Sequence, residues 1–250
     1  MSLFDSFDPV SKEILKPTHM IRPVAGFPET VVLTFEEKSL RLLKNVCAFR
    51  VAAILKGGRD IPVYALRYNE QDLAICQSII GGAATAALVE ELRALGAKRV
   101  LLYGACGVLD KAVTAGHFIL PTAACRDEGT SYHYLPPADY VEVPTAGRLA
   151  EIFEELGLSY VLGKTWTTDA IYRETRANAD KRRAEGCVAV EMECASAMAV
   201  GQFRRMPVYQ FLYAEDSLDG SDWDPRTWGA VPASNYEKYL RVALEAAVRL

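Results

Sequence analysis

The feature of this 250-residue sequence that most limits its fold is a repeated alternation of short apolar runs with amphipathic segments. Short runs rich in β-branched and aliphatic residues predict strands, whereas apolar residues spaced three and four apart predict helices. We expect strands at residues 30–33, 47–55, 61–68, 73–77, 99–103, 117–123, 160–167, 189–191 and 208–213. We expect helices at residues 36–45, 84–95, 146–156, 193–204 and 236–249, with a polar helix or loop at 173–185. Strands separated by helices imply a mostly parallel sheet covered on both faces.

Proline placement predicts the domain organisation. Pro9, Pro17, Pro23 and Pro28 interrupt regular structure near the N-terminus. We therefore expect an N-terminal arm over residues 1–29, lying on the body or on a neighbouring subunit, followed by a single domain over residues 30–250. Inside that domain the Lys56-Gly57-Gly58 segment predicts a hairpin turn between two antiparallel strands.

Charge and composition exclude several classes of function. A formal net charge of -4 and a pI of about 5.5 give no electrostatic basis for binding a nucleic acid or an anionic membrane. No apolar run approaches the roughly 20 residues that span a bilayer, and the acidic start of the chain is unlike a signal peptide. The six cysteines form no C-x-x-C pair, and the three histidines lack metal-ligand spacing. We expect a cytoplasmic protein with reduced thiols, no metal and a small-molecule ligand.

Small residues mark two places where a strand meets a turn. Gly81-Gly82 precedes a predicted helix, where it would either approach an anionic ligand or only form a tight turn. The Gly104–Gly107 segment, which contains Ala105 and Cys106, follows a buried strand; it either keeps a cleft free of side chains or forms a close-packed turn. Ligands of parallel α/β sheets bind at the carboxyl ends of strands, so both segments are candidates for the site.

Carboxylates at two further strand ends are stronger candidates. Glu191 and Glu193 flank Met192 where an apolar run meets a helix, a position suited to accepting hydrogen bonds from two vicinal hydroxyls, as on a ribose. The alternative is an acid pair that only stabilises the helix N-terminus. Asp216 follows another apolar strand and is a candidate general acid if burial raises its pKa; the alternative is an acidic surface turn. His133 lies among aromatic residues and could line a pocket.

Taken in order, these segments resemble the nucleoside phosphorylase-I family, which includes purine nucleoside and uridine phosphorylases and related nucleosidases. The resemblance covers about residues 30–220 and is most specific at Val190-Glu191-Met192-Glu193 followed by Asp216. The loop at residues 127–134 looks most like that of the uridine-type members. The resemblance implies an α/β fold, a three-layer α/β/α sandwich with a central mixed sheet, in a homo-oligomer that is a dimer or a trimer of dimers.

The same resemblance assigns roles to individual residues. Met192 and Glu193 would contact the ribose, Asp216 would protonate N7 of a leaving purine, and Arg226 would support that acid. Ile171 stands where the family places an aromatic residue that stacks on the base, and His19 resembles a histidine lent to a neighbour's ribose pocket. The predicted substrate-binding set also contains Glu191, Gly107, Cys106 and His133. The predicted phosphate-binding set is Lys38, Arg41 and Ala105.

Departures from the family pattern keep the reaction open. Leu102 and Ala105 replace an arginine and a hydroxyl residue that usually bind phosphate, and Glu36-Glu37 would repel it. We therefore predict cleavage of a nucleoside by orthophosphate to a free base and a pentose 1-phosphate, without an organic cofactor. The alternatives are a phosphate-independent nucleosidase and a nucleoside-binding protein without turnover. Asp216 favours a purine substrate, whereas residues 131–134 favour uridine, so the base stays open.

Overall fold

The computed structural model describes residue 4, residues 6–56 and residues 59–250, and every predicted strand and helix has a counterpart in it. The strands are β1 (Thr30–Thr34), β2 (Phe49–Lys56), β3 (Asp60–Tyr68), β4 (Gln71–Gln77), β5 (Arg99–Val108), β6 (Phe118–Asp127), β7 (Tyr140–Glu142), β8 (Tyr160–Thr168), β9 (Cys187–Glu191) and β10 (Val208–Ser217). The α-helices are α1 (Glu37–Leu42), α2 (Gly82–Leu95), α3 (Ala146–Glu155), α4 (Arg176–Ala184), α5 (Cys194–Arg204) and α6 (Ala233–Ala247). Short 3-10 turns are η2 (Pro17–His19), η3 (Leu43–Asn45), η4 (Thr130–His133) and η5 (Ile171–Arg173).

The central sheet is mixed and partly closed on itself. Its strand order is β10-β6-β8-β9-β5-β1-β4-β3-β2, and β10 also pairs in parallel with β5. This second pairing closes β5, β10, β6, β8 and β9 into a ring, while β1, β4, β3 and β2 extend outward from β5. Cys106, Val108, Ile119, Leu212 and Ala214 belong to one buried apolar cluster contributed by strands of the ring. The predicted central mixed sheet is thus confirmed.

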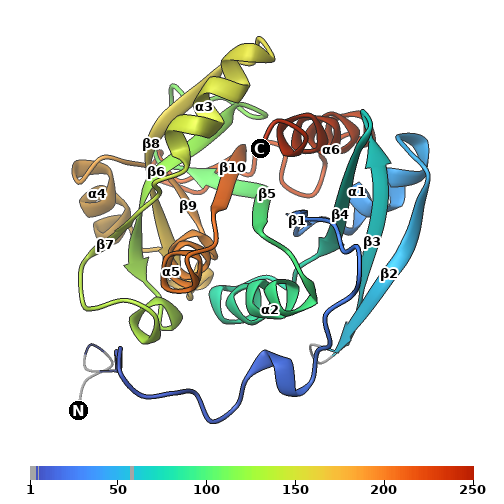
Figure 1. Cartoon of the computed structure of the whole chain (residues 1–250). Helices are drawn as coiled ribbons and strands as arrows, with labels where there is room; N and C mark the ends of the chain where they lie inside the picture. Colours follow the sequence, from blue (N-terminus) through green and yellow to red (C-terminus); the bar gives the residue numbers. More distant parts are fainter. Residues whose placement is uncertain (1–3, 5, 57–58) are drawn as a thin grey trace.

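Helices cover both faces of the sheet, as the three-layer prediction requires (Figure 1). Helices α2 and α5 pack together on one face, against the apolar cluster that contains Val31, Leu102 and Met198. Helices α1, α3 and α6 cover the other face, around Phe153, Phe211 and Leu240. Each buried cluster joins one sheet face to its helices, so apolar burial on both sides holds the three layers together.

Three predicted elements differ in detail from the structure. The predicted 36–45 helix divides into α1 and η3. The polar 173–185 segment is helical from Arg176, because Thr175 caps α4 by accepting a hydrogen bond from Asn178 N. The strand predicted at residues 99–103 is longer than expected: β5 continues through Gly104–Gly107 to Val108, so the alternative of a close-packed turn there is wrong. Small residues there serve close packing, since a Cβ at Gly104 would lie 2.8 Å from the Phe35 ring.

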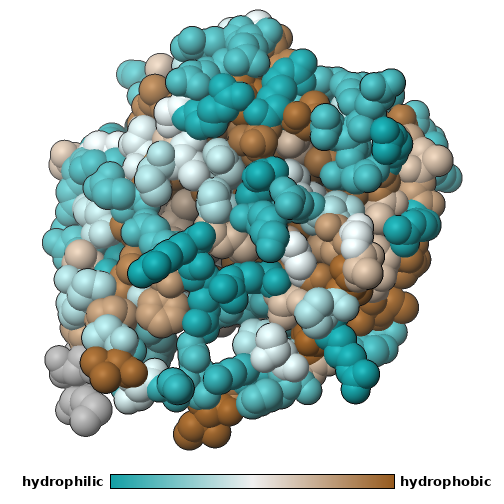
Figure 2. Space-filling model, in the orientation of Figure 1, coloured by the Kyte–Doolittle hydropathy of each residue, from teal (hydrophilic) through white to brown (hydrophobic). Residues whose placement is uncertain are grey.

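The described part of the N-terminal arm runs along the outside of the molecule beneath α2 (Figure 1). One hydrogen bond, from Val24 N to Leu95 O at 3.0 Å, joins it to the end of that helix. Its apolar side chains Val10, Ile14, Leu15 and Met20 are exposed. Figure 2 shows a mostly polar face with apolar patches, among them one at the lower edge where the arm runs.

The predicted hairpin joins β2 and β3, which pair antiparallel as expected. Lys56 and Asp60 face each other at its end, and their side chains form an ion pair of 2.6 Å. Gly57 and Gly58 of the predicted turn lie outside the described residues. Among the helices that the structure describes, none is both long enough and apolar enough to cross a membrane.

Candidate active site

The end of β5 brings two of the predicted carboxylate segments together. Gly107 pairs antiparallel with Val190 of β9 and parallel with Asp216 of β10. The turn that carries Glu191 and Glu193 and the strand end that carries Asp216 therefore flank one residue. A Cβ at Gly107 would lie 2.7 Å from Leu218 Cδ1 and 3.3 Å from Asp216 Oδ1, so glycine is what leaves room beside that carboxyl.

Glu191 is buried and its carboxylate organises the start of α5. Oε2 accepts hydrogen bonds from the backbone N–H groups of Glu193 at 2.8 Å and Cys194 at 2.7 Å. Oε1 accepts one from Thr167 Oγ1 at 2.5 Å. These contacts favour the alternative of an acid that stabilises a helix N-terminus. Direct binding of substrate by Glu191 stays a prediction.

Glu193 comes from the same turn but faces Gly81. Its Oε1 accepts a hydrogen bond of 2.7 Å from Gly81 N. Gly81 has φ 108°, a conformation that glycine adopts without strain, and this conformation directs its N–H toward the carboxyl. Burial raises the pKa of Glu193 to about 8, and the nearby charge of Glu191 adds to the effect. The Gly81-Gly82 segment thus joins the site through Glu193.

Asp216 is a buried carboxyl with two unlike oxygens. Oδ2 accepts a 2.6 Å hydrogen bond from the indole Nε1 of Trp223, whereas Oδ1 is buried and has no hydrogen-bond partner among the described residues. Burial raises the pKa of Asp216, and the Trp223 hydrogen bond and the charge of Arg226 oppose this rise. Arg226 lies near enough to act on Asp216 by charge, while its Nη1 donates to Val113 O at 2.6 Å. A buried carboxyl with a raised pKa is suited to proton donation.

Other carboxyl groups with raised pKa values lie near Asp216 or near the adjacent Glu215. Burial, together with the charges of Glu36 and Asp216, raises the pKa of Glu215 to about 7. Burial and the charge of Asp216 raise the pKa of Glu174 to about 7. Burial also raises the pKa of Glu36, and Lys38 opposes the rise at both Glu36 and Glu215. Ionisable groups with displaced pKa values cluster at functional sites, which supports placing the site here.

The predicted phosphate-binding residues are only partly brought to this region. Lys38 lies with its Nζ 5.0 Å from the centre of the Tyr236 ring and acts by charge on Glu36 and Glu215. Arg41 is exposed and pairs with Glu37 at 2.8 Å. Ala105 lies opposite Tyr213 in the sheet and offers no hydroxyl group, and Leu102 is fully buried in the core. Lys38 is therefore the best placed of the three predicted phosphate ligands.

The remaining predicted substrate residues occupy varied positions. Cys106 is buried in β5, where Sγ donates to Tyr213 O at 3.6 Å; such a thiol is a packing group first. Met192 is half-buried in the Glu191–Glu193 turn, and Ile171 is exposed in η5. His133 is exposed at the end of η4. His19 is exposed on the arm and accepts a hydrogen bond from Lys16 N at 3.4 Å. Contact of these side chains with a substrate stays a prediction.

Sequence reasoning missed three residues of this region: Trp223, Glu174 and Glu215. Trp223 lies in an acidic segment that was interpreted as a solvated loop, although a tryptophan there is unusual. Glu174 sits in a polar segment without any apolar pattern. Glu215 directly precedes Asp216, but only the folded chain shows that Glu36 approaches it.

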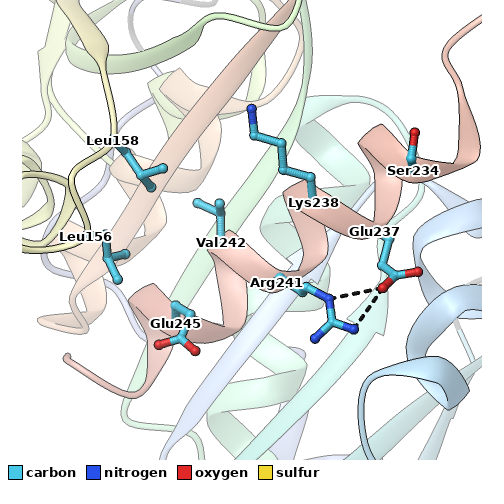
Figure 3. Close-up of a pocket in the computed structure, with 8 residues that line it drawn as sticks. All are labelled: Leu156, Leu158, Ser234, Glu237, Lys238, Arg241, Val242 and Glu245. Atoms are coloured by element: carbon cyan, nitrogen blue, oxygen red, sulfur yellow. Dashed lines mark hydrogen bonds and ion pairs between the residues drawn. The ribbon is translucent and has the colours of Figure 1, made fainter.

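A hollow on the surface lies away from these carboxyls. An open depression of about 490 Å³ runs beside α6, and none of the candidate site residues lines it (Figure 3). It is lined by Leu156, Leu158, Ser234, Glu237, Lys238, Arg241, Val242 and Glu245. We place the site at the end of β5 instead, because the buried carboxyls lie there. Within the described ranges, no three His, Cys, Asp or Glu side chains are grouped so as to hold a metal ion.

Comparison with known proteins places the chain in context. The family model of the Phosphorylase superfamily matches residues 24–248. The chain is 28% identical over 243 residues to a guanosine phosphorylase of Halorubrum lacusprofundi, and the alignment covers 94% of this chain and 99% of that protein. A uridine phosphorylase structure from Vibrio fischeri ES114 superposes with a TM-score of 0.76 at 20% identity, covering 96% and 100% of the two chains. An AMP nucleosidase structure from Bacteroides thetaiotaomicron VPI-5482 superposes with a TM-score of 0.70 at 23% identity, covering 90% of each chain.

Proposed function

Because this chain belongs to the Phosphorylase superfamily, we propose that it cleaves the N-glycosidic bond of a nucleoside with orthophosphate as acceptor. The products are the free base and a pentose 1-phosphate. The proposal needs no metal and no organic cofactor. The observation that carries it is the placement of two buried carboxyls beside Gly107: Asp216 at the end of β10 and Glu193 in the turn between β9 and α5.

The chemistry of bond cleavage gives each carboxyl a distinct task. The base departs with the bonding electron pair, and protonation by Asp216 makes it a better leaving group. The sugar then carries positive charge, which a nearby anion stabilises. Glu193 supplies that anion when it accepts hydrogen bonds from the two ribose hydroxyls, because such donors favour the ionised form and bring its raised pKa back down.

Two observations bear on the group that captures the sugar. The guanosine phosphorylase of Halorubrum lacusprofundi is similar over nearly its whole length, which supports phosphate as acceptor, and Lys38 supplies a positive charge. The second candidate is hydrolysis, and the carboxyl groups of Glu36 and Glu215 favour it, since ionised carboxylates repel phosphate and can accept a proton from water.

A base-release assay separates these candidates. Inosine, guanosine, adenosine, uridine and methylthioadenosine are each incubated with the protein in the presence and absence of phosphate. We expect phosphate-dependent release from at least one of them. Equal rates without phosphate would establish hydrolysis instead. No release together with thermal stabilisation by a nucleoside would indicate a binding protein without turnover.

Matched variants connect that activity to the site. Asp216→Asn should abolish most base release while leaving nucleoside binding intact. Asp222→Asn removes an exposed carboxylate from the loop after β10 and should leave the rate unchanged. Similar rates in both variants would remove Asp216 from the mechanism.

A homo-oligomer and a cytoplasmic location are further parts of this proposal. Exposed apolar residues on the arm and on β2, such as Ile14 and Val51, are the kind of surface that a partner subunit covers. A monomer by light scattering at working concentration would exclude the shared site that His19 implies.

A further inference from the structure

The two oxygens of Asp216 differ in what their surroundings allow. Oδ2 accepts the 2.6 Å hydrogen bond from Trp223 Nε1. Oδ1 is buried without a hydrogen-bond partner in the described part of the chain. An indole N–H donates but cannot accept, so the oxygen that faces it must present a lone pair. Protonation of Oδ2 would make that oxygen a hydroxyl, a weaker acceptor for the indole N–H, whereas protonation of Oδ1 keeps Oδ2 as the carbonyl oxygen, the better acceptor.

From this asymmetry we propose that Trp223 is a positioning residue that holds the acidic proton of Asp216 on Oδ1, the oxygen that delivers it to the leaving base. The delivery step rests on the proposed function, but the placement of the proton does not. In the step itself the Oδ1–H bond breaks, a base nitrogen takes the proton, and Asp216 becomes a carboxylate still bound to the indole.

The backbone around Trp223 holds the indole in place. Ser217 and Asp224 exchange two backbone hydrogen bonds of 2.9 Å, which pin the loop that carries Trp223 to the end of β10. The Trp223 ring also meets the Trp228 ring edge to face, with 6.0 Å between ring centres. The indole is 55% exposed, so its apolar burial is modest for a tryptophan. Its defined position beside a buried acid is better explained by the hydrogen bond than by packing.

Gly107 lies on the other side of the carboxyl. Oδ1 is the Asp216 oxygen nearest to the position that a Cβ of Gly107 would occupy, at 3.3 Å. A glycine there removes the side chain that would cover Oδ1. The indole occupies Oδ2, and Oδ1, which has no hydrogen-bond partner among the described residues, is the oxygen left to donate a proton to a ligand at the end of β5.

Charged groups on several elements act on Asp216, and the effect of Trp223 must be measured against them. Glu174 follows η5, Glu215 precedes Asp216 in β10, and Asp224 and Arg226 lie in the following loop. Cys106 of β5 is also close enough to interact by charge. Among the groups that lower the pKa of Asp216, the Trp223 hydrogen bond is the largest, ahead of Arg226. Without the indole N–H we therefore expect the pKa of Asp216 to rise.

Indole nitrogen NMR tests the placement of the proton without requiring turnover. The chain has three tryptophans, so three indole N–H signals are expected, and Trp223→Phe identifies one of them. In the wild type we expect the Trp223 signal to shift with pH. At its protonated limit the signal should still differ from that of Asp216→Ala, where the hydrogen bond is absent. In Asp216→Asn the pH-dependent shift should disappear. Glu174→Gln should preserve it. If protonation moves the signal to its position in Asp216→Ala, the hydrogen bond breaks when Asp216 takes up its proton, so Trp223 cannot hold that proton on Oδ1 and the proposal is overturned.

Kinetics provide the second test. Asp216 must be protonated to act, so a higher pKa of Asp216 in Trp223→Phe should move the basic limb of the kcat–pH profile to higher pH. Loss of the positioning contact should also lower kcat roughly tenfold at unchanged KM. Asp222→Asn, which changes an exposed neighbour of Trp223, is the control and should match the wild type. An unmoved basic limb in Trp223→Phe would refute the positioning role. Absence of turnover with every nucleoside would contradict the proposed function, while the indole titration would still decide where the proton lies.

Discussion

Replacing Glu193 by glutamine should make the folded protein more stable at neutral pH. The carboxyl is 6% exposed, and burial raises its pKa from an ordinary 4.5 to about 8. Because the folded state holds the proton more tightly than the unfolded chain does, ionisation costs the folded state stability as the pH rises from 4.5 to about 8. Below pH 4.5 both states are protonated and the cost disappears.

The size of this effect follows from the displacement of the pKa. Each pH unit between the two pKa values corresponds to about 1.4 kcal/mol, so the cost reaches about 3 kcal/mol at pH 7. Glutamine keeps an acceptor for the Gly81 N–H and carries no charge. Its buried NH2 group gains no certain partner, which costs about 1 kcal/mol. The expected net gain is about 2 kcal/mol at pH 7, or about 5 °C in Tm.

Urea denaturation of wild type and Glu193→Gln at pH 4, 7 and 8 measures this gain. The difference in unfolding free energy should be absent or reversed at pH 4 and should grow toward pH 8. Glu151→Gln, which changes an exposed glutamate of α3, should match the wild type at each pH. A Glu193→Gln variant that is no more stable than wild type at pH 8 would refute the reasoning. The same variant should bind nucleosides more weakly, because the ribose hydroxyls lose their anionic acceptor.

Three further outcomes follow from the site. Asp216→Asn should lower kcat by about 10²–10⁴-fold with little change in nucleoside affinity, and equal losses of kcat in Asp222→Asn would contradict this. Gly107→Ala should lower the unfolding free energy by about 1–3 kcal/mol, because its Cβ would lie 2.7 Å from Leu218 Cδ1. Gly147→Ala, at a helix position with open space, should not lower it. Equal stability of the two variants would count against the packing argument. Glu191→Ala should destabilise the fold by about 1–3 kcal/mol by leaving two N–H groups of the α5 start without an acceptor, and an unchanged denaturation midpoint would exclude that capping role.

Local patterns in the sequence were sufficient to find the elements of the fold. Strand and helix periodicities depend on neighbouring residues only, so the spacing of apolar positions predicted each strand of the ring and each covering helix. The small strand β7 escaped prediction, since three residues carry too short a pattern. The predicted strand ended too early, at Tyr103, because glycine weakens a strand pattern, whereas packing against Phe35 requires a small residue at Gly104 inside β5.

The candidate site, like the fold, could be predicted from the sequence only in part. Glu193 and Asp216 could be singled out from the sequence, because each carboxyl follows an apolar run and their order matches a known pattern. Their roles could not be separated from that of Glu191. A sequence does not show which carboxyl accepts the backbone hydrogen bonds of a helix N-terminus.

Only the tertiary structure decided which groups surround the carboxyl of Asp216. The pairing of β10 with β5 places Asp216 beside Gly107, and the loop after β10 returns Trp223 to the same carboxyl. The approach of Glu36 to Glu215 likewise joins distant parts of the chain. The pKa of a carboxyl depends on burial and on charges nearby in space, and neither is a property of its neighbours in sequence. The residue types were therefore determined by the sequence, whereas their protonation was decided by the packing around them.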